Sequence, residues 1–156
     1  MNELLNPKGE IKIIINYDNG EQVSWVTKNT ILNSGKQAIA KSLTNQIDGD
    51  FNYFITRMIF GNGGTQEGSP RYIYTDRNGL FGLTVLTKPV ISSTDPNVPQ
   101  QAVFTSVVRL DDAVGQTINE MALELANGDL FCMATFADLS KTAQMQITFN
   151  WKISFV

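Results

Sequence analysis

The sequence has no histidine, a single cysteine and few charged residues. Charged side chains make up 17% of the 156 residues, whereas an average globular protein has roughly 25%. Without histidine there can be no serine or cysteine catalytic triad, no histidine-ligated zinc and no histidine general base. The lone Cys132 excludes a disulfide bond within the chain. Its place between Phe131 and Met133 predicts a buried core side chain rather than a reactive thiol.

The chain also lacks a long apolar segment and an excess of positive charge. No stretch reaches the roughly 18 apolar residues of a membrane-spanning helix, and residues 1–7 lack the basic and apolar regions of a signal peptide. With 12 basic and 15 acidic residues the formal net charge is −3, which argues against binding of nucleic acid by phosphate neutralisation. We therefore expect neither a membrane nor a nucleic acid as a partner.

Uncharged polar residues take the place of the missing charges. Asn, Gln, Ser and Thr together make up 46 of the 156 residues. Desolvating a neutral amide or hydroxyl costs less than desolvating an ion, so such a surface suits contact with other subunits. An ordinary β-rich protein can have the same composition, because threonine is common in strands. Both interpretations stay open at the level of composition.

Strand and turn signals dominate the chain. Asp18-Asn19-Gly20 and Asn127-Gly128-Asp129 are typical of tight hairpin turns. The nearly continuous apolar run over residues 53–60 predicts a strand that is buried on both faces. Residues 61–79 are predicted to form a long irregular loop, and residues 92–99 a polar loop with two prolines. The other predicted strands cover about residues 11–15, 23–27, 82–91, 101–110, 117–125 and 130–137.

The clearest pattern is the alternation of polar and apolar residues from Gln144 to Phe155. This period of two predicts a long strand with one buried face and one polar face. Gln146, Thr148 and Asn150 lie on the polar face, where another protein could cover them, and they are candidate partner-binding residues. We expect this strand to be packed into the sheet, so that deletion of residues 153–156 abolishes soluble folding.

A single short amphipathic helix is predicted after the second strand. Asn29 or Asn33-Ser34 can cap it, and its apolar side consists of Ile31, Leu32, Ala38, Ile39 and Leu43. The strands and this helix together predict a mainly β fold. We expect an antiparallel β-sandwich or jelly-roll-like fold with one short amphipathic helix, with a partly closed barrel as the alternative. Residues 1–9 are predicted to be an N-terminal arm, and residues 10–156 a single β-rich domain.

Three motifs contain residue types that could support catalysis or ligand binding, and each favours a structural interpretation. The glycine-rich run Gly61–Gly68 follows a strand, but Ser69-Pro70 stands where a phosphate-binding loop needs its lysine, and no helix follows. Asp111-Asp112 lacks the additional oxygens that a hard cation requires. Glu120 and Glu124 share a strand face as paired glycosidase carboxylates do, yet a chain with 15 acidic residues offers such pairs by chance. We therefore predict no catalytic residue, no metal and no cofactor.

The densest cluster of arginine and tyrosine lies in the predicted loop over residues 61–79. Arg71, Tyr72, Tyr74 and Arg77 are of the residue types enriched at interface hot spots, and we predict that they bind a partner protein. A plain loop is the simpler interpretation. Sugar stacking is a further alternative, as is binding of single-stranded nucleic acid, which would need a positive groove.

The order of motifs over residues 29–155 resembles a diffuse group of small tailed-bacteriophage virion proteins. Members of this group are described as head decoration, tail or baseplate-associated proteins. The motifs that carry the resemblance are Thr30-Ile31-Leu32-Asn33-Ser34-Gly35, Met58-Ile59-Phe60-Gly61-Asn62-Gly63-Gly64-Thr65, Ile118-Asn119-Glu120-Met121-Ala122-Leu123, Leu130-Phe131-Cys132-Met133-Ala134-Thr135-Phe136, Lys141-Thr142 and Ile147-Thr148-Phe149-Asn150-Trp151-Lys152-Ile153-Ser154-Phe155.

The resemblance implies a non-enzymatic structural protein of the virion, made in the cytoplasm of a host bacterium. We expect a capsid auxiliary or cement protein that binds other virion proteins, such as capsid or tail subunits, and forms a homo-oligomer. A tail, baseplate or fibre component is the alternative, including a carbohydrate-binding adhesin that uses Trp25 or the Tyr72/Tyr74 loop. An enzyme that degrades glycans with acidic residues alone is a further hypothesis from a different class.

Overall fold

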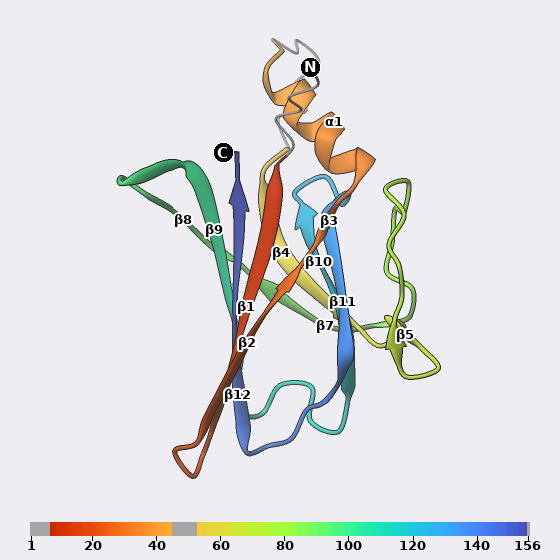
Figure 1. Cartoon of the computed structure of the whole chain (residues 1–156), viewed down its shortest axis with the longest axis vertical. Coiled ribbons are helices and arrows are strands. Elements are labelled where there is room, and N and C mark those ends of the chain that lie inside the picture. The colour runs from red at the N-terminus through yellow and green to blue at the C-terminus, as the bar shows by residue number, and fades with distance from the viewer. Residues whose placement is uncertain (1–6, 45–52, 156) are drawn as a thin grey trace.

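A computed structural model describes residues 7–44 and 53–155 of the chain. Two five-stranded antiparallel sheets pack against each other as a β-sandwich (Figure 1), which confirms the predicted fold class. Sheet A contains, in spatial order, β2 (Gln22–Lys28), β1 (Lys8–Tyr17), β12 (Met145–Ser154), β9 (Val98–Val108) and β8 (Ile91–Asp95). Sheet B contains β3 (Thr30–Ile31), β11 (Leu130–Ser140), β10 (Thr117–Leu125), β4 (Ile55–Gly61) and β7 (Thr84–Pro89).

The remaining elements lie outside the two sheets. The short hairpin of β5 (Thr65–Gln66) and β6 (Ser69–Pro70) stands beside sheet B. The helix α1 (Asn33–Ser42) lies at the end of the sandwich where β1 begins. No helix within residues 7–44 and 53–155 is long and apolar enough to cross a membrane.

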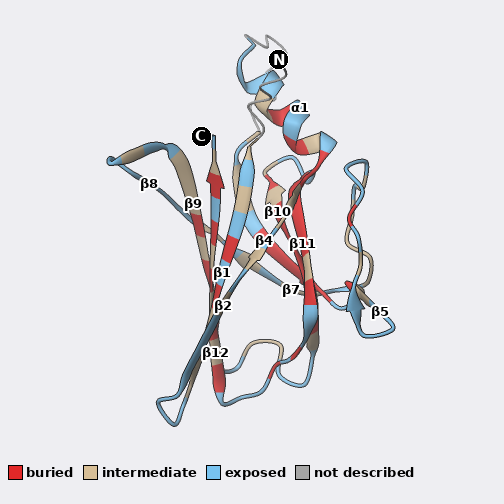
Figure 2. Cartoon of the chain, in the orientation of Figure 1, coloured by how far each residue is buried: buried red, intermediate tan, exposed pale blue. Residues whose placement is uncertain are grey.

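The core lies between the sheets, where the inward side chains of both meet (Figure 2). Strand β1 contributes Ile11 and Ile13, and β12 contributes Phe149 and Trp151, all of them fully buried. Phe149 packs against Phe60 of β4 with 4.8 Å between the ring centroids. Each of these side chains contributes roughly 1.5–3 kcal/mol by burial, so the inward faces supply the main stabilisation of the fold.

The single cysteine belongs to this core, as predicted. Cys132 is 0% exposed on β11 and is a free thiol. Burial in apolar surroundings raises its pKa, because the thiolate would lose its hydration. The side chain therefore acts as a small hydrophobe.

The alternating C-terminal segment forms the central strand of sheet A. Strand β12 pairs with β1 on one side and with β9 on the other. The inward residues Ile147, Phe149, Trp151 and Ile153 are all buried, whereas Lys152 on the outward face is exposed. The predicted strand with one buried and one polar face is confirmed.

The helix is shorter than predicted, because three of the five residues expected on its apolar side lie outside α1. Ile31 belongs to β3 and Leu32 is the N-cap residue, with no side-chain capping bond. Neither Asn29 nor Asn33-Ser34 caps the helix, since the Ser34 hydroxyl instead donates to the Leu130 carbonyl. Leu43 is 83% exposed. The helix therefore packs through few residues, among them Gly35 and Ala38.

The loop predicted over residues 92–99 is wrong, and the arm predicted over residues 1–9 overlaps the first strand. Residues 92–99 are not a polar loop, because Ile91–Asp95 and Val98–Val108 form a hairpin at the edge of sheet A. All five residues of β8 are exposed, so no alternation marked them as a strand. Of the arm expected over residues 1–9, residues 1–6 lie outside the described ranges, and Lys8 and Gly9 belong to β1.

The outer faces of the two sheets differ. Residues 62–83, named here the covering segment, pack on the outer face of sheet B. This explains why β10 and β11 are buried on both faces, and why Met58, Ile59 and Phe60 of β4 are all buried. The strand predicted over residues 53–60 is confirmed only in this part, because β4 begins at Ile55 and Phe54 is 60% exposed. On sheet A, no described segment packs in the same way on the outer face, which is left open.

Candidate functional site

The covering segment is joined to sheet B by an apolar cluster. Ile73, at 6% exposed, and the partly buried Leu80 and Phe81 pack on outward side chains of the sheet. These side chains are Ile59 of β4, Ala122 of β10 and Met133 of β11. The stretch predicted as an irregular loop is therefore a folded layer on the sandwich.

The carboxylate of Glu120 binds the covering segment to sheet B through hydrogen bonds. Glu120 is 0% exposed on β10. Its Oε2 accepts hydrogen bonds from the backbone N–H of Gly63 at 2.6 Å and of Gly82 at 2.9 Å, and its Oε1 accepts one from Phe81 at 2.7 Å. Hydrogen bonds to a charged acceptor are about twice as strong as neutral ones, so both ends of the segment are tied to one side chain.

Asn119 supports the same layer beside Glu120. Its Oδ1 accepts a hydrogen bond from the Gly64 N–H at 2.7 Å, and its Nδ2 donates to the Asn62 carbonyl at 3.2 Å and to Asp138 at 3.0 Å. The hydrogen bonds from Asn119 and Thr65 lower the pKa of Asp138. The pairing of β10 with β11 shifts register between Ile118 and Glu120, at the position of these two anchors.

The glycine-rich run binds a carboxylate of its own chain. A Cβ atom on Gly63 would lie 2.3 Å from the Gly82 nitrogen, and one on Gly64 would lie 2.3 Å from the Asn119 carbonyl oxygen. Both positions require glycine because the backbone passes too close for any side chain. The Gly63 amide is thus turned towards Glu120 and the Gly64 amide towards Asn119, and the turn-forming interpretation of the sequence fits this arrangement.

The two arginines of the predicted partner-binding cluster brace the covering segment. Arg71 donates from Nε to the Gly63 carbonyl at 2.8 Å. Arg77 donates from Nε to Gly79 and from Nη2 to Leu80, each at 3.1 Å. The guanidinium carbon of Arg77 lies 3.7 Å from the ring centroid of Phe81, a cation–π contact. Both arginines are half-buried. Their guanidinium groups therefore hold the covering segment in place and project little into solvent.

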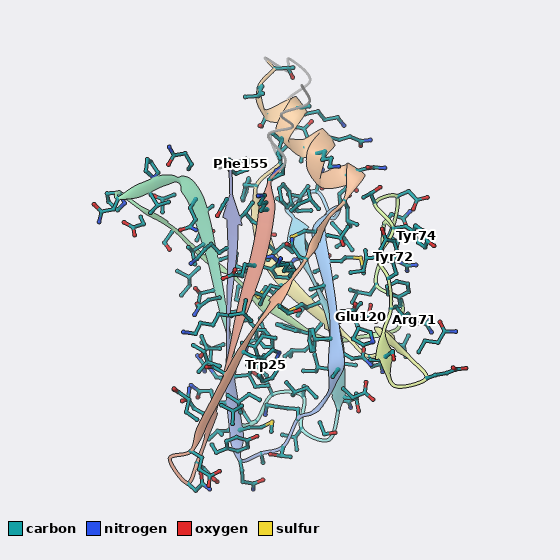
Figure 3. All side chains as sticks on the ribbon, viewed as in Figure 1. Trp25, Arg71, Tyr72, Tyr74, Glu120 and Phe155 are labelled. Carbon is teal, nitrogen blue, oxygen red and sulfur yellow. The ribbon has the colours of Figure 1, made fainter. Side chains whose placement is uncertain are left out.

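The two tyrosines of the cluster point outward (Figure 3). Tyr72 is 75% exposed and Tyr74 is 67% exposed, while Ile73 between them is buried. Their rings form an edge-to-face pair with 4.8 Å between centroids. The backbone beneath them is held by the Thr135 hydroxyl, which donates to the Arg71 carbonyl at 2.7 Å. The structure thus presents an aromatic pair on a braced support.

The other predicted partner-binding residues lie on a different surface. Gln146, Thr148 and Asn150 occupy the middle of the open face of sheet A, where each is half-buried by its neighbours. Asn150 accepts a hydrogen bond from the Thr105 hydroxyl of β9 at 2.8 Å. The sequence-predicted residues therefore form two separate surfaces, the tyrosine pair beside sheet B and the polar face of sheet A.

The remaining acidic candidates have internal partners. Glu124 forms an ion pair with Arg57, so it and Glu120 are both occupied. Asp112 accepts a hydrogen bond from Lys88 at 2.7 Å, which lowers the pKa of the aspartate. Among the residues that the structure describes, no group of three or more Cys, Asp or Glu side chains could hold a metal ion.

Trp25 is less available than the sequence alone indicated. It lies on the inward face of β2, opposite Ile13, and packs half-buried against the core. Figure 3 shows Trp25 low in the view, away from the labelled Tyr72 and Tyr74. Of the two aromatic sites considered for sugar stacking, the Tyr72/Tyr74 loop is the more exposed.

Comparison with known proteins identifies no family. No protein-family model matches the chain, no curated protein matches it, and no solved structure matches it.

Proposed function

We propose that the chain is a non-enzymatic structural protein of a bacteriophage virion. In this role it binds neighbouring subunits as a capsid auxiliary or cement protein. The observation that carries the proposal is the exposed Tyr72–Tyr74 pair on its braced loop. The resemblance of the motif order to small virion proteins supports other virion subunits as the partners of this surface.

The tyrosine pair has the properties of an interface hot spot. Tyrosine brings a large area and a polar end at low entropic cost, and such residues carry much of the energy of protein interfaces. The covering segment is fixed by Glu120, Asn119 and the two arginines. A fixed support reduces the ordering cost of association, which favours use of this loop as a binding surface.

The open face of sheet A supplies a second surface for assembly. Its middle rows carry amides and hydroxyls, among them Gln146, Thr148 and Asn150. Neutral polar groups lose less free energy on desolvation than ions do. An auxiliary protein that lies across joints between subunits could therefore use both surfaces, and many copies would add their effects.

Particle location is the direct test of the proposed role. We expect antibody raised against the recombinant chain to label purified particles of the virus that encodes it, over the head surface. Label confined to the tail would favour the tail or baseplate alternative over a cement protein. Absence of the chain from purified particles would contradict a structural role in the virion.

Replacement of the tyrosine pair should weaken attachment. We expect Tyr72→Ser/Tyr74→Ser to lower the affinity for particles lacking the chain at least tenfold, since loss of one hot-spot residue costs about 2 kcal/mol or more. The melting temperature should be unchanged, because both rings are exposed. Leu83→Ser, at an equally exposed residue, is the control, and equal binding by all three proteins would exclude the tyrosine surface.

A carbohydrate-binding adhesin of a tail or fibre is the second candidate. The same exposed pair favours it, because tyrosine rings stack on sugar faces. A glycan array distinguishes the two candidates. Binding of a glycan by the wild-type chain, lost in Tyr72→Ser/Tyr74→Ser, would establish the adhesin, whereas a flat array at high protein concentration would remove it.

A further inference from the structure

A lysine-rich basin lies at the end of the sandwich where sheet A meets β3, α1 and Thr75 of the covering segment. It has a volume of about 820 Å³ and is found where β1 begins and β2 and β12 end, beside α1. The charged side chains that line it are Lys8, Glu10, Lys28, Lys36 and Lys152. Four ammonium groups thus accompany one carboxylate, on a chain whose formal net charge is −3.

Strand register explains why the charge gathers there. Glu10 of β1 lies opposite Lys28 of β2 and opposite Lys152 of β12. Lys8 and Lys12 lie two residues away on β1 and therefore point from the same face. The ion pairs among the described residues are Arg57–Glu124 and Lys88–Asp112, and neither involves a basin lysine. The excess positive charge favours an anionic occupant.

The extent of the charge indicates a compact occupant. Beyond Lys12 and Lys152, the outward residues of β12 are Asn150, Thr148 and Gln146, which are neutral. The basic area is therefore too short to follow a nucleic-acid backbone, which carries a charge at every nucleotide. A small group of carboxylates fits its length better.

The chain carries such a group at its opposite end. Asp18 and Glu21 flank the tip of the β1–β2 hairpin, and both are exposed. The tip is closed by the Tyr17 carbonyl, which accepts from the Gly20 N–H at 3.0 Å, with Gly20 at φ +91°. Neither carboxylate forms an ion pair within the part of the chain that the structure describes. The tip projects past the end of the sandwich (Figure 1).

One molecule cannot fill its own basin with this tip. Strand β1 has ten residues between the two sites, and a rise of about 3.4 Å per residue separates them by roughly 30 Å. The tip is narrow, because paired strands lie about 4.8 Å apart, and this shape suits a concave site.

We propose that the lysine basin binds the Asp18–Glu21 hairpin tip of a second copy of this chain. The contact is head-to-tail and heterologous, so its repetition produces a ring or an open chain of subunits. It goes beyond the proposed attachment to particles, because it uses neither the tyrosine pair nor another virion protein. Its energy comes largely from opposite charges near a water-exposed rim, and it is therefore sensitive to salt.

Sedimentation analysis of the full chain tests the contact. At 20 mM salt we expect the average mass to rise with protein concentration, and at 0.5 M salt we expect a monomer. Lys28→Gln/Lys152→Gln and Asp18→Asn/Glu21→Gln should each weaken self-association at least tenfold. An equimolar mixture of the two variants should form a dimer and nothing larger, because one intact basin then meets one intact tip.

The control variant makes the same change in net charge as the hairpin-tip variant, but at two acidic residues outside the tip. Glu67→Gln/Asp95→Asn also removes two exposed acidic charges, and it should associate like the wild type. A wild-type chain that stays monomeric at low salt would overturn the contact, as would variants that associate normally or a mixture that stays monomeric. A monomer that still attached to particles through Tyr72 and Tyr74 would overturn this contact alone and leave the proposed function standing.

Discussion

Glu120→Gln should lower the free energy of unfolding by about 3 kcal/mol, because buried donors lose a charged acceptor. The carboxylate accepts three backbone hydrogen bonds from Gly63, Phe81 and Gly82. Glutamine has the same shape but only one acceptor oxygen, so its NH₂ group would face at least one of these N–H groups. Urea unfolding followed by tryptophan fluorescence measures the change.

Glu124→Gln is the matched control on the same strand. Glu124 forms an ion pair with Arg57, whose side chain is 48% exposed, and a pair of this kind contributes about 1 kcal/mol or less. Amide hydrogen exchange provides a second measurement. Loss of the Glu120 carboxylate should raise the exchange rates of the amides of residues 62–83, while the amides of the sandwich core stay protected. If the two variants were equally stable, the covering segment would be held by its apolar contacts rather than by the carboxylate.

Secondary structure is predicted best from the sequence where one face of an element is buried, because burial then produces a regular alternation of apolar and polar residues. Strand β12 is recognisable because each buried residue from Met145 to Ile153 alternates with a polar one. Strand β8 has no such period, because all of its residues from Ile91 to Asp95 are exposed at the edge of sheet A. The sequence of Ser92, Ser93 and Thr94 therefore resembles a loop, and only the pairing with β9 in the structure identifies these residues as a strand.

The covering segment could not be predicted, because its anchors are remote in sequence. Glu120 lies 57 residues from Gly63 and 38 from Gly82, and no local pattern connects them. The signals that could have pointed to it are the apolar Ile73 between two tyrosines and the glycines at residues 61, 63 and 64. The tyrosine pair was found from residue type alone, but its separation from the arginines needed the structure.

The position of β12 between β1 and β9 makes the C-terminal strand a determinant of the whole fold. We expect deletion of residues 153–156 to leave no cooperative unfolding transition. The deletion removes Ile153, which is 2% exposed, and its pairing with Gly9 and Ala102. Loss of a buried isoleucine costs about 2–5 kcal/mol, and the lost ladder bonds add to this against a total stability of roughly 5–15 kcal/mol. Circular dichroism during heating measures the transition.

Deletion of residues 155–156 alone separates this effect from a general effect of shortening the chain. Phe155 is 43% exposed, and its N–H donates to the Gln100 carbonyl at 3.0 Å. Removing a part-exposed side chain and one backbone hydrogen bond should cost about 1–2 kcal/mol, so the shorter deletion should still melt cooperatively. Because Ile153 is held on both sides by neighbouring strands, the step from one deletion to the other should carry most of the loss. A chain without residues 153–156 that melts like the full chain would mean that β1 and β9 can close sheet A around a shorter β12.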